Sequence, residues 1–230
     1  MLKFLLNNQT IDAADLPQGT TVLDFVRYHR HLVGTKSGCR EGDCGACTVL
    51  VGELVGDGVR YRSMTSCLLP LANVGGKHIV TVEGINFNGE RSMVNGQFIR
   101  ENSTLTIDHS SLLTPVQSAM VECNASQCGF CTVGFVMSLT GFCLENTSKT
   151  LKNGQNRSEN GKNTEGSNAA AIASIDGNIC RCTGYKSIER AAERLTNLLS
   201  ERAADHSPLD FAVQNGIVPP YFLEIKNRLQ

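Results

Sequence analysis

Eight of the ten cysteines fall into two closely spaced sets, and this spacing constrains the structure more than any other feature of the chain. The first set has three cysteines in one short loop and a fourth after nineteen further residues, whereas the second combines a C-x-x-C pair with a later C-x-C pair. In chain order the first set is Cys39, Cys44, Cys47 and Cys67, and the second is Cys128, Cys131, Cys180 and Cys182. The start of the chain turns polar too soon for a secretory signal. We therefore expect a cytoplasmic protein whose thiols bind metal, with disulfides as the weaker alternative.

The spacing of the first set, C-x4-C-x2-C followed by a distant cysteine, is typical of plant-type 2Fe–2S sites. In this set three thiolates would converge from one loop on a two-iron rhomb, and the fourth would come from a different element. Gly38, Gly42 and Gly45 are expected to let the loop adopt positive φ and bring backbone N–H groups close to the sulfurs. A tetrahedral zinc site also uses four thiolates, but zinc favours two short pairs. An iron–sulfur cluster is therefore the favoured interpretation of this set.

The second set, taken alone, fits either a zinc site or an iron–sulfur cluster. One of its pairs lies in SQCGFCTVGF and the other in GNICRCTGY, and both segments are predicted helix junctions. A thiolate at a helix N-terminus is stabilised by the helix dipole. The ferredoxin-type loop upstream makes a second cluster the better interpretation.

The first third of the chain has the pattern of a small mixed sheet folded over a helix. Short apolar runs predict strands over 2–6, 48–54 and 78–85. An apolar stripe behind a possible cap at Thr20 predicts a helix over 21–32.

From about residue 112 onwards the pattern becomes helical. Thr114 and Pro115 form a good N-cap and N1 pair, and the last long helix is expected over 187–201. The stretch 147–167 is rich in Asn, Gly, Ser and Lys and is too polar to join a core, so it is interpreted as a surface insertion. The second half is thus expected to be a small helical domain.

The motifs GCREGDCGACTVLV, QCGFCTVGF and GNICRCTGY resemble the iron–sulfur part of the xanthine dehydrogenase family of molybdenum hydroxylases. The resemblance covers residues 1–200 apart from the insertion, and the tail GIVPPYFLEIKNRL is similar to the family's linker toward an FAD-binding domain. It implies an α+β chain in which a β-grasp, ferredoxin-like 2Fe–2S domain precedes an all-α four-helix-bundle 2Fe–2S domain. The implied boundaries are 1–88 and 89–201, followed by a linker at 202–230. FAD would be carried by another chain or by a further part of the same subunit.

The resemblance also implies a function in electron transfer, with no catalytic residue on this chain. Substrate would be hydroxylated at a molybdopterin centre on a separate large subunit, and electrons would then pass through the helical-domain cluster, the ferredoxin-like cluster and FAD to NAD. Cys182 would be the ligand whose loop contacts the pterin, and Gln127 would contact the same cofactor. The second cluster should then face the molybdenum partner and the first cluster the flavin.

Three functions stay open. The favoured one is the iron–sulfur subunit of a purine-oxidising xanthine dehydrogenase, because small subunits of the other type lack so long a tail. The second is the same role in an aldehyde, carbon monoxide or N-heterocycle dehydrogenase, and the third is a non-enzymatic metal-binding redox sensor. A net charge of −1 and 19% charged residues give no reason to expect nucleic acid or an anionic membrane as a partner. No apolar run approaches the roughly 20 residues needed to span a bilayer.

Overall fold

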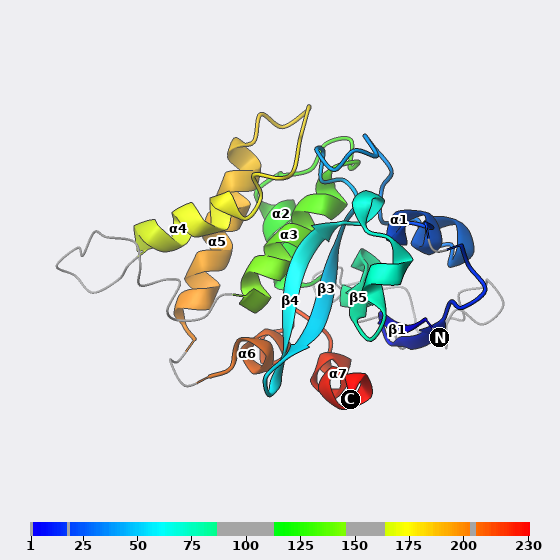
Figure 1. Cartoon of the computed structure of the whole chain (residues 1–230). Coiled ribbons are helices and arrows are strands. Elements are labelled where there is room, and N and C mark those ends of the chain that lie inside the picture. The colour runs from blue at the N-terminus through cyan, green and yellow to red at the C-terminus, as the bar shows by residue number, and fades with distance from the viewer. Residues whose placement is uncertain (1, 18, 87–112, 146–163, 203–205) are drawn as a thin grey trace, which may run out of the picture.

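The computed structural model describes residues 2–17, 19–86, 113–145, 164–202 and 206–230, so most of the predicted insertion lies outside the described residues (Figure 1). The strands are β1 (Lys3–Leu6), β2 (Gln9–Asp12), β3 (Thr48–Val55), β4 (Gly58–Thr65) and β5 (His78–Val80). The helices are α1 (Val22–Asp24), α2 (Pro115–Glu122), α3 (Thr132–Glu145), α4 (Thr164–Ala173), α5 (Lys186–Ser200), α6 (Pro208–Gln214) and α7 (Ile225–Leu229). A π-helical turn, Phe25–His29, continues α1, and 3₁₀ turns occupy Ser66–Leu68, Leu71–Val74, Val82–Ile85 and Pro220–Glu224. The chain is therefore α+β, as expected.

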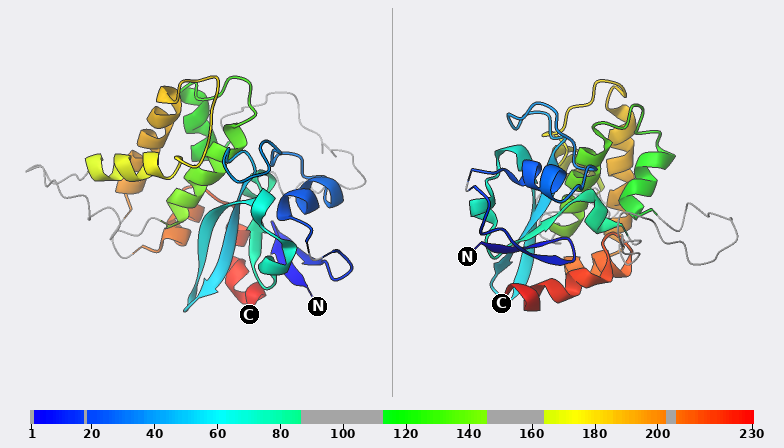
Figure 2. Two further views of the ribbon diagram at one scale, coloured as in Figure 1. Left: turned by 45° about the horizontal axis from the view of Figure 1, so that its top comes forward. Right: turned by 90° about the vertical axis from the view of Figure 1, so that its right-hand side faces the viewer.

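The five strands form one mixed sheet in the order β2-β1-β5-β3-β4, in which β1 and β5 are parallel and the other neighbours antiparallel. Successive side chains of a strand point to opposite faces. In β3, Leu50 packs into the core shared with the helices, whereas Val49 and Val51 pack with Phe25 on the other face. The sheet is thus covered on both faces and lies between α1 and the helical layer (Figure 2).

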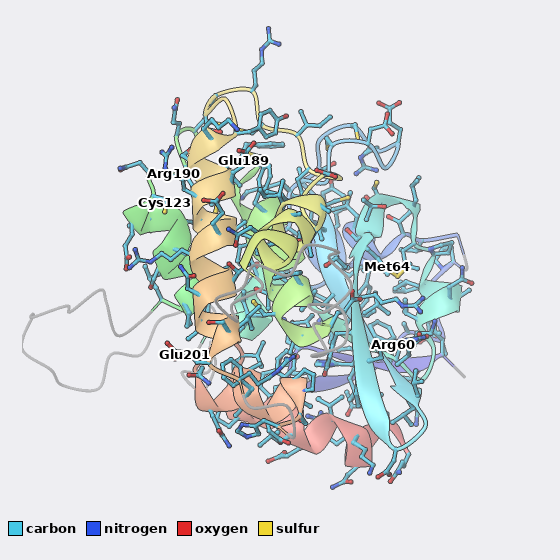
Figure 3. All side chains as sticks on the ribbon, turned by 90° about the vertical axis from the view of Figure 1, so that its left-hand side faces the viewer. Arg60, Met64, Cys123, Glu189, Arg190 and Glu201 are labelled. Carbon is cyan, nitrogen blue, oxygen red and sulfur yellow. The ribbon has the colours of Figure 1, made fainter. Side chains whose placement is uncertain are left out.

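The helical layer is organised around α3, which packs on β3 and β4 and buries every residue from Gly134 to Leu144. A helix that is apolar all round belongs in a core. Further from the sheet, α5 packs against α2 and α4, and it runs from Glu189 and Arg190 near one end to Glu201 at the other (Figure 3). Within the described residues, no helix is both long and apolar enough to cross a membrane.

The helix expected over 21–32 is shorter in the structure. Its N-cap is Thr21, whose hydroxyl accepts the Asp24 N–H at 3.1 Å. The end is set by the wider π-helical turn, in which the Arg30 N–H donates to the Phe25 carbonyl at 3.1 Å. His31 then adopts a φ of 57°, which no right-handed helix can continue. Apolar periodicity overestimated the length because Leu32 packs on the core from outside the helix.

The strand expected over 78–85 ends at Val80 because Asn7 intercepts the next donor. The Asn7 side-chain oxygen accepts the Thr81 N–H at 2.9 Å, and the Gly84 N–H then donates to the Thr81 carbonyl at 2.9 Å to start a 3₁₀ turn. A Cβ on Gly84 would lie 2.1 Å from the Asn7 side-chain oxygen, so only glycine fits here. A side chain far away in the sequence therefore ends this strand.

The tail, expected to be a linker, is packed onto the rest of the molecule. Phe222 and Ile225 are fully buried, and the Phe222 ring lies 5.2 Å from that of Tyr61 in β4. The Tyr221 hydroxyl donates to the Gly84 carbonyl at 2.9 Å. The tail thus crosses from the helical layer back to the sheet, at the end of the molecule opposite the cysteine loops (Figure 1).

Candidate metal centres

Strand register brings the fourth cysteine of the first set to the other three. In the β3–β4 pair, Thr48 lies opposite Thr65, so the residues just outside the ladder, Cys47 and Ser66, are also neighbours. The Ser66 hydroxyl donates to the Cys47 carbonyl at 2.7 Å, and this bond holds the turn that carries Cys67. The hairpin therefore places the Cys67 thiol beside that of Cys47.

The loop that holds the other three cysteines turns its backbone N–H groups toward sulfur. The Sγ atom of Cys39 accepts N–H bonds from Cys44 at 3.4 Å and Glu41 at 3.5 Å, and the Cys39 N–H donates to the Cys44 Sγ at 3.5 Å. The N–H of Glu41 and then that of Cys44 lower the pKa of Cys39 to about 7. Such a concave arrangement of N–H groups stabilises negative charge on bound ligands.

Glycines shape this loop, although not all in the expected way. Gly42 and Gly45 have φ values of 89° and 67°, as expected, and Arg40 unexpectedly shares the left-handed conformation at 61°. Gly38 does not adopt a positive φ. A side chain does not fit at this position, because a Cβ there would lie 2.9 Å from the Cys44 sulfur. Arg40 is held by its guanidinium, which pairs with Asp24 at 2.7 Å and so ties the loop to α1.

The thiols of the first set are arranged as two pairs. Cys39 and Cys44 are joined by the N–H···S bonds described above and are half-buried, whereas Cys47 and Cys67 are buried. Burial and the adjacent Cys47 thiol raise the pKa of Cys67 to about 11. One pair therefore lies near the surface and the other beneath it.

The second set repeats this arrangement at the end of the helical layer. Cys128 and Cys131 lie between α2 and α3, and Cys180 and Cys182 lie in the loop before α5. Burial and a hydrogen bond with Cys180 raise the pKa of Cys131 to about 12, and a hydrogen bond with Cys128 raises that of Cys182. The pairs are thus Cys131 with Cys180 and Cys128 with Cys182. The pKa of Cys131, directly before α3, is therefore raised rather than lowered as expected for a thiolate at a helix N-terminus.

All ten cysteines lie in described residues, and each is a free thiol. Two cysteines lie outside the sets: Cys143 is buried, with its pKa raised to about 12 by burial, and Cys123 is half-buried beside α5 (Figure 3). Within the described part of the chain, no group of three or more His, Cys, Asp and Glu side chains is gathered so as to hold a single metal ion.

The two sets meet at a junction that was not predicted from the sequence. The Ile179 N–H donates to the Cys44 carbonyl at 3.0 Å. Beside it, the buried Asn178 side chain donates to the Gly45 carbonyl at 3.0 Å and accepts from the Ser138 hydroxyl at 2.7 Å. A Cβ on Gly134 would lie 2.3 Å from the Gly45 carbonyl oxygen, so α3 also touches this point. The loops that carry both sets therefore gather at one end of the molecule (Figure 2).

Burial of a polar residue such as Asn178 depends on how α3 packs on the loop, which local sequence does not encode. Its position two residues before Cys180 was the one available signal. Gln127 and Cys182, predicted to contact molybdopterin, are both exposed at the end of the molecule where the sets meet.

Comparison with known proteins supports two iron–sulfur domains. Residues 5–71 match the 2Fe-2S iron-sulfur cluster binding domain family, and residues 103–193 match the [2Fe-2S] binding domain family. The chain is 40% identical over 200 residues to xanthine dehydrogenase from Blastobotrys adeninivorans, which covers 83% of this chain and 11% of the relative. It is 32% identical over 190 residues to aldehyde oxidase 2 from Cavia porcellus, and this alignment covers 82% of this chain and 11% of the relative. The chain thus spans only about a tenth of the length of these relatives.

Solved structures show the same fold. Quinoline 2-oxidoreductase from Pseudomonas putida 86 aligns over 99% of this chain and 95% of the compared chain, with a TM-score of 0.54 and 23% identity. The aldehyde oxidoreductase from Desulfovibrio gigas aligns over 98% of this chain and 21% of its own, with a TM-score of 0.60 and 22% identity.

The fold and the two family matches define a two-domain 2Fe–2S protein. The relatives named above are oxidoreductases, and the segment that they share with this chain is their iron–sulfur part. The chain belongs to the iron–sulfur part of the xanthine dehydrogenase and aldehyde oxidase family of molybdenum hydroxylases.

Proposed function

We propose that this chain is the electron-transfer iron–sulfur subunit of a xanthine dehydrogenase-type molybdenum hydroxylase. The observation that carries the proposal is that two sets of paired thiols meet at the Cys44–Ile179 hydrogen bond. When bound, two 2Fe–2S clusters would supply one-electron carriers between a molybdopterin centre and FAD, with NAD as final acceptor. The protein's part is to hold the thiolates, fix the separation of the two sets and exclude water from the buried pairs.

The donor chemistry of both sites fits such clusters. A two-iron cluster takes two thiolates on each iron, and each set offers two pairs of thiols. We assign the first cluster to Cys39, Cys44, Cys47 and Cys67, and the second to Cys128, Cys131, Cys180 and Cys182. We further assign a β-grasp domain to residues 1–88, a four-helix bundle to 89–201 and a segment leading toward an FAD-binding domain to 202–230.

The exposure of the thiols supports a direction for electron transfer. Cys128 and Cys182 are the exposed pair of the second set, and Gln127 beside them is exposed as well. We assign this surface to the molybdopterin-binding large subunit in a cytoplasmic enzyme, with Gln127 and Cys182 contacting the cofactor. The first set would then face the FAD-binding partner.

A second candidate is the same electron-transfer role in an enzyme that oxidises aldehydes or N-heterocycles. This second candidate is supported by relatives named aldehyde oxidase and by the structural similarity to quinoline 2-oxidoreductase. The two candidates differ in the large subunit, so turnover of xanthine, an aldehyde and quinoline by the assembled enzyme separates them.

Substitution of one ligand from each set tests the assignment. In Cys67→Ser the first cluster should be lost or spectroscopically altered while the second is retained, and Cys128→Ser should do the reverse. Cys123→Ser is the matched control, because this half-buried thiol belongs to neither set. Iron content and low-temperature EPR of the reduced proteins are the measurements. Two unchanged EPR signals in either ligand variant would contradict the assignment.

The direction of electron transfer has its own test in the assembled enzyme. Cys182→Ser should impair reduction by substrate while dithionite still reduces the cluster at Cys39. Unchanged turnover would remove Cys182 from the path.

A further inference from the structure

The loop between Cys180 and α5 is closed by a small network of hydrogen bonds that ends on a sulfur atom. The Thr183 hydroxyl lies 3.1 Å from the Cys180 Sγ, which also accepts the Thr183 N–H at 3.4 Å. The Tyr185 N–H donates to the Thr183 hydroxyl oxygen at 3.2 Å. The Cys180 N–H in turn donates to the Tyr185 hydroxyl at 3.0 Å.

The network fixes the direction of the bond between Thr183 and Cys180. The Thr183 oxygen already accepts the Tyr185 N–H, so its own hydrogen is free to point at the sulfur. A sulfur that ligates iron is a thiolate without a hydrogen, and it can only accept. The Thr183 hydroxyl is therefore the donor. Each bond in such a chain polarises the next and strengthens it.

Tyr185 adopts an unfavourable backbone conformation that makes this network possible. Its φ of 69° lies in the left-handed region, which residues other than glycine rarely adopt. This conformation, directly before α5, lets its N–H reach Thr183 while its hydroxyl reaches back to Cys180. Backbone strain of this kind persists where the surroundings hold it and is common at functional sites.

Burial makes the hydrogen bond to sulfur effective. Cys180 is only 6% exposed, and Thr183 is half-buried. In this low-dielectric environment a charge-assisted bond to a thiolate is stronger than it is in water. The first set differs, because the sulfur of Cys39 receives its bonds from backbone N–H groups of Cys44 and Glu41.

We propose that the Thr183 hydroxyl raises the reduction potential of the second cluster by donating a hydrogen bond to the Cys180 thiolate, with Tyr185 as the residue that positions it. This inference rests on the proposed function, because it requires a cluster at Cys180. Reduction adds negative charge to the cluster and its ligands, so a donor to a ligand sulfur stabilises the reduced form more than the oxidised form. The second cluster would thus be the easier one to tune by changing a single side chain.

Anaerobic redox titration of the reconstituted chain, followed by EPR, tests the inference. Thr183→Val removes the hydroxyl at nearly constant volume and should shift the second cluster to a more negative potential, while Thr183→Ser should restore it. The first cluster serves as an internal reference. The matched control is Thr132→Val, since Thr132 also lies next to a proposed ligand but its hydroxyl pairs with Ser126 at 2.7 Å.

The outcomes separate this inference from the proposed function. If the unmodified chain binds no cluster at Cys180, by iron content and EPR, the proposed function fails first. If both clusters form and Thr183→Val leaves the second potential unchanged, or shifts both potentials equally, the inference is overturned.

A measurement on the unmodified protein covers the case in which the valine variant loses its cluster. Proton ENDOR of the reduced second cluster in H₂O and D₂O should show at least two coupled exchangeable protons, because both the hydroxyl and the N–H of Thr183 point at the Cys180 sulfur. A single coupled exchangeable proton would overturn the inference without any substitution.

Discussion

The backbone N–H of Ile179 donates to the carbonyl oxygen of Cys44 across the contact between the sheet and the helical layer, at a distance of 3.0 Å. Each residue adjoins a thiol set: Cys44 belongs to the first, and Ile179 directly precedes Cys180 of the second. The separation of the two sets is therefore fixed by the backbone. Stability of this junction and transfer of electrons across it should depend on the same contacts.

Gly45→Ala should destabilise the junction more than its backbone conformation alone explains. A Cβ at Gly45 would lie 2.3 Å from the Gly177 carbonyl oxygen. We expect a loss of about 3 kcal/mol or more in the free energy of unfolding, from left-handed strain and overpacking together. Gly76→Ala is the control, since Gly76 has the same φ of 67° with nothing within 4 Å, and it should cost only about 1 kcal/mol. Equal losses of unfolding free energy in Gly45→Ala and Gly76→Ala, measured by urea unfolding, would contradict the close approach of Gly45 to Gly177.

Asn178→Ala should leave two buried polar partners unsatisfied. Asn178 is 4% exposed, and its amide joins the Gly45 carbonyl to the Ser138 hydroxyl. We expect a loss of about 2–3 kcal/mol in unfolding free energy, together with slower electron transfer between the clusters. Freeze-quench EPR after rapid reduction measures the transfer. Ser126→Ala, which removes an exposed hydrogen bond, should change stability by less than about 0.5 kcal/mol. Equally small losses of unfolding free energy in Asn178→Ala and Ser126→Ala would show that the Asn178 amide does not stabilise the junction.

His78→Gln should flatten the pH dependence of stability. In the folded protein the Tyr61 hydroxyl donates to Nδ1 at 2.8 Å, and Nε2 donates to the Asn7 carbonyl at 2.9 Å, so the neutral ring is fully satisfied. Burial lowers the pKa of His78 from 6.5 to about 3. Between these values the unfolded chain binds a proton that the folded chain does not, so stability falls as the pH falls below about 6.5.

The contribution of His78 to this slope is at most about 1.4 kcal/mol per pH unit. Urea unfolding of both proteins at pH 7, 6 and 5 measures it. Because the glutamine variant does not titrate in this range, its stability should fall less steeply. If the unfolding free energy changed equally with pH in the unmodified protein and in His78→Gln, His78 would be shown to take up a proton without unfolding of the protein.

Phe222→Ala should show that the tail is part of the folded core. Phe222 is fully buried against Tyr61, whereas its neighbour Leu223 is 46% exposed. We expect Phe222→Ala to cost about 3–5 kcal/mol and Leu223→Ala less than about 1 kcal/mol. Similar small effects of the two substitutions would mean that the tail does not contribute to the fold.

The cysteine spacing divided the eight thiols into two sets, but it could not predict how they pair within each set. The pairing of Cys47 with Cys67 depends on the register of β3 and β4, where Thr48 lies opposite Thr65. Register is a long-range property that spacing in a loop does not encode. The division into a mixed sheet and a helical half was predicted correctly because apolar periodicity is local and strong in both.

Three of the features that escaped prediction depend on residues distant in sequence. Asn7 ends β5 early, and Asn178 reaches Gly45 from the opposite half of the chain. Phe222 becomes a core residue only because the tail returns to the sheet. Local patterns cannot report such contacts.

The most direct test of two 2Fe–2S clusters on this chain is metal and sulfide analysis of the anaerobically purified protein, combined with visible and low-temperature EPR spectra. We predict four irons and four acid-labile sulfides per chain, visible absorbance in the oxidised protein and two distinct EPR signals after full reduction. Zinc bound to the thiols, with no visible absorbance and no EPR signal, would contradict the account.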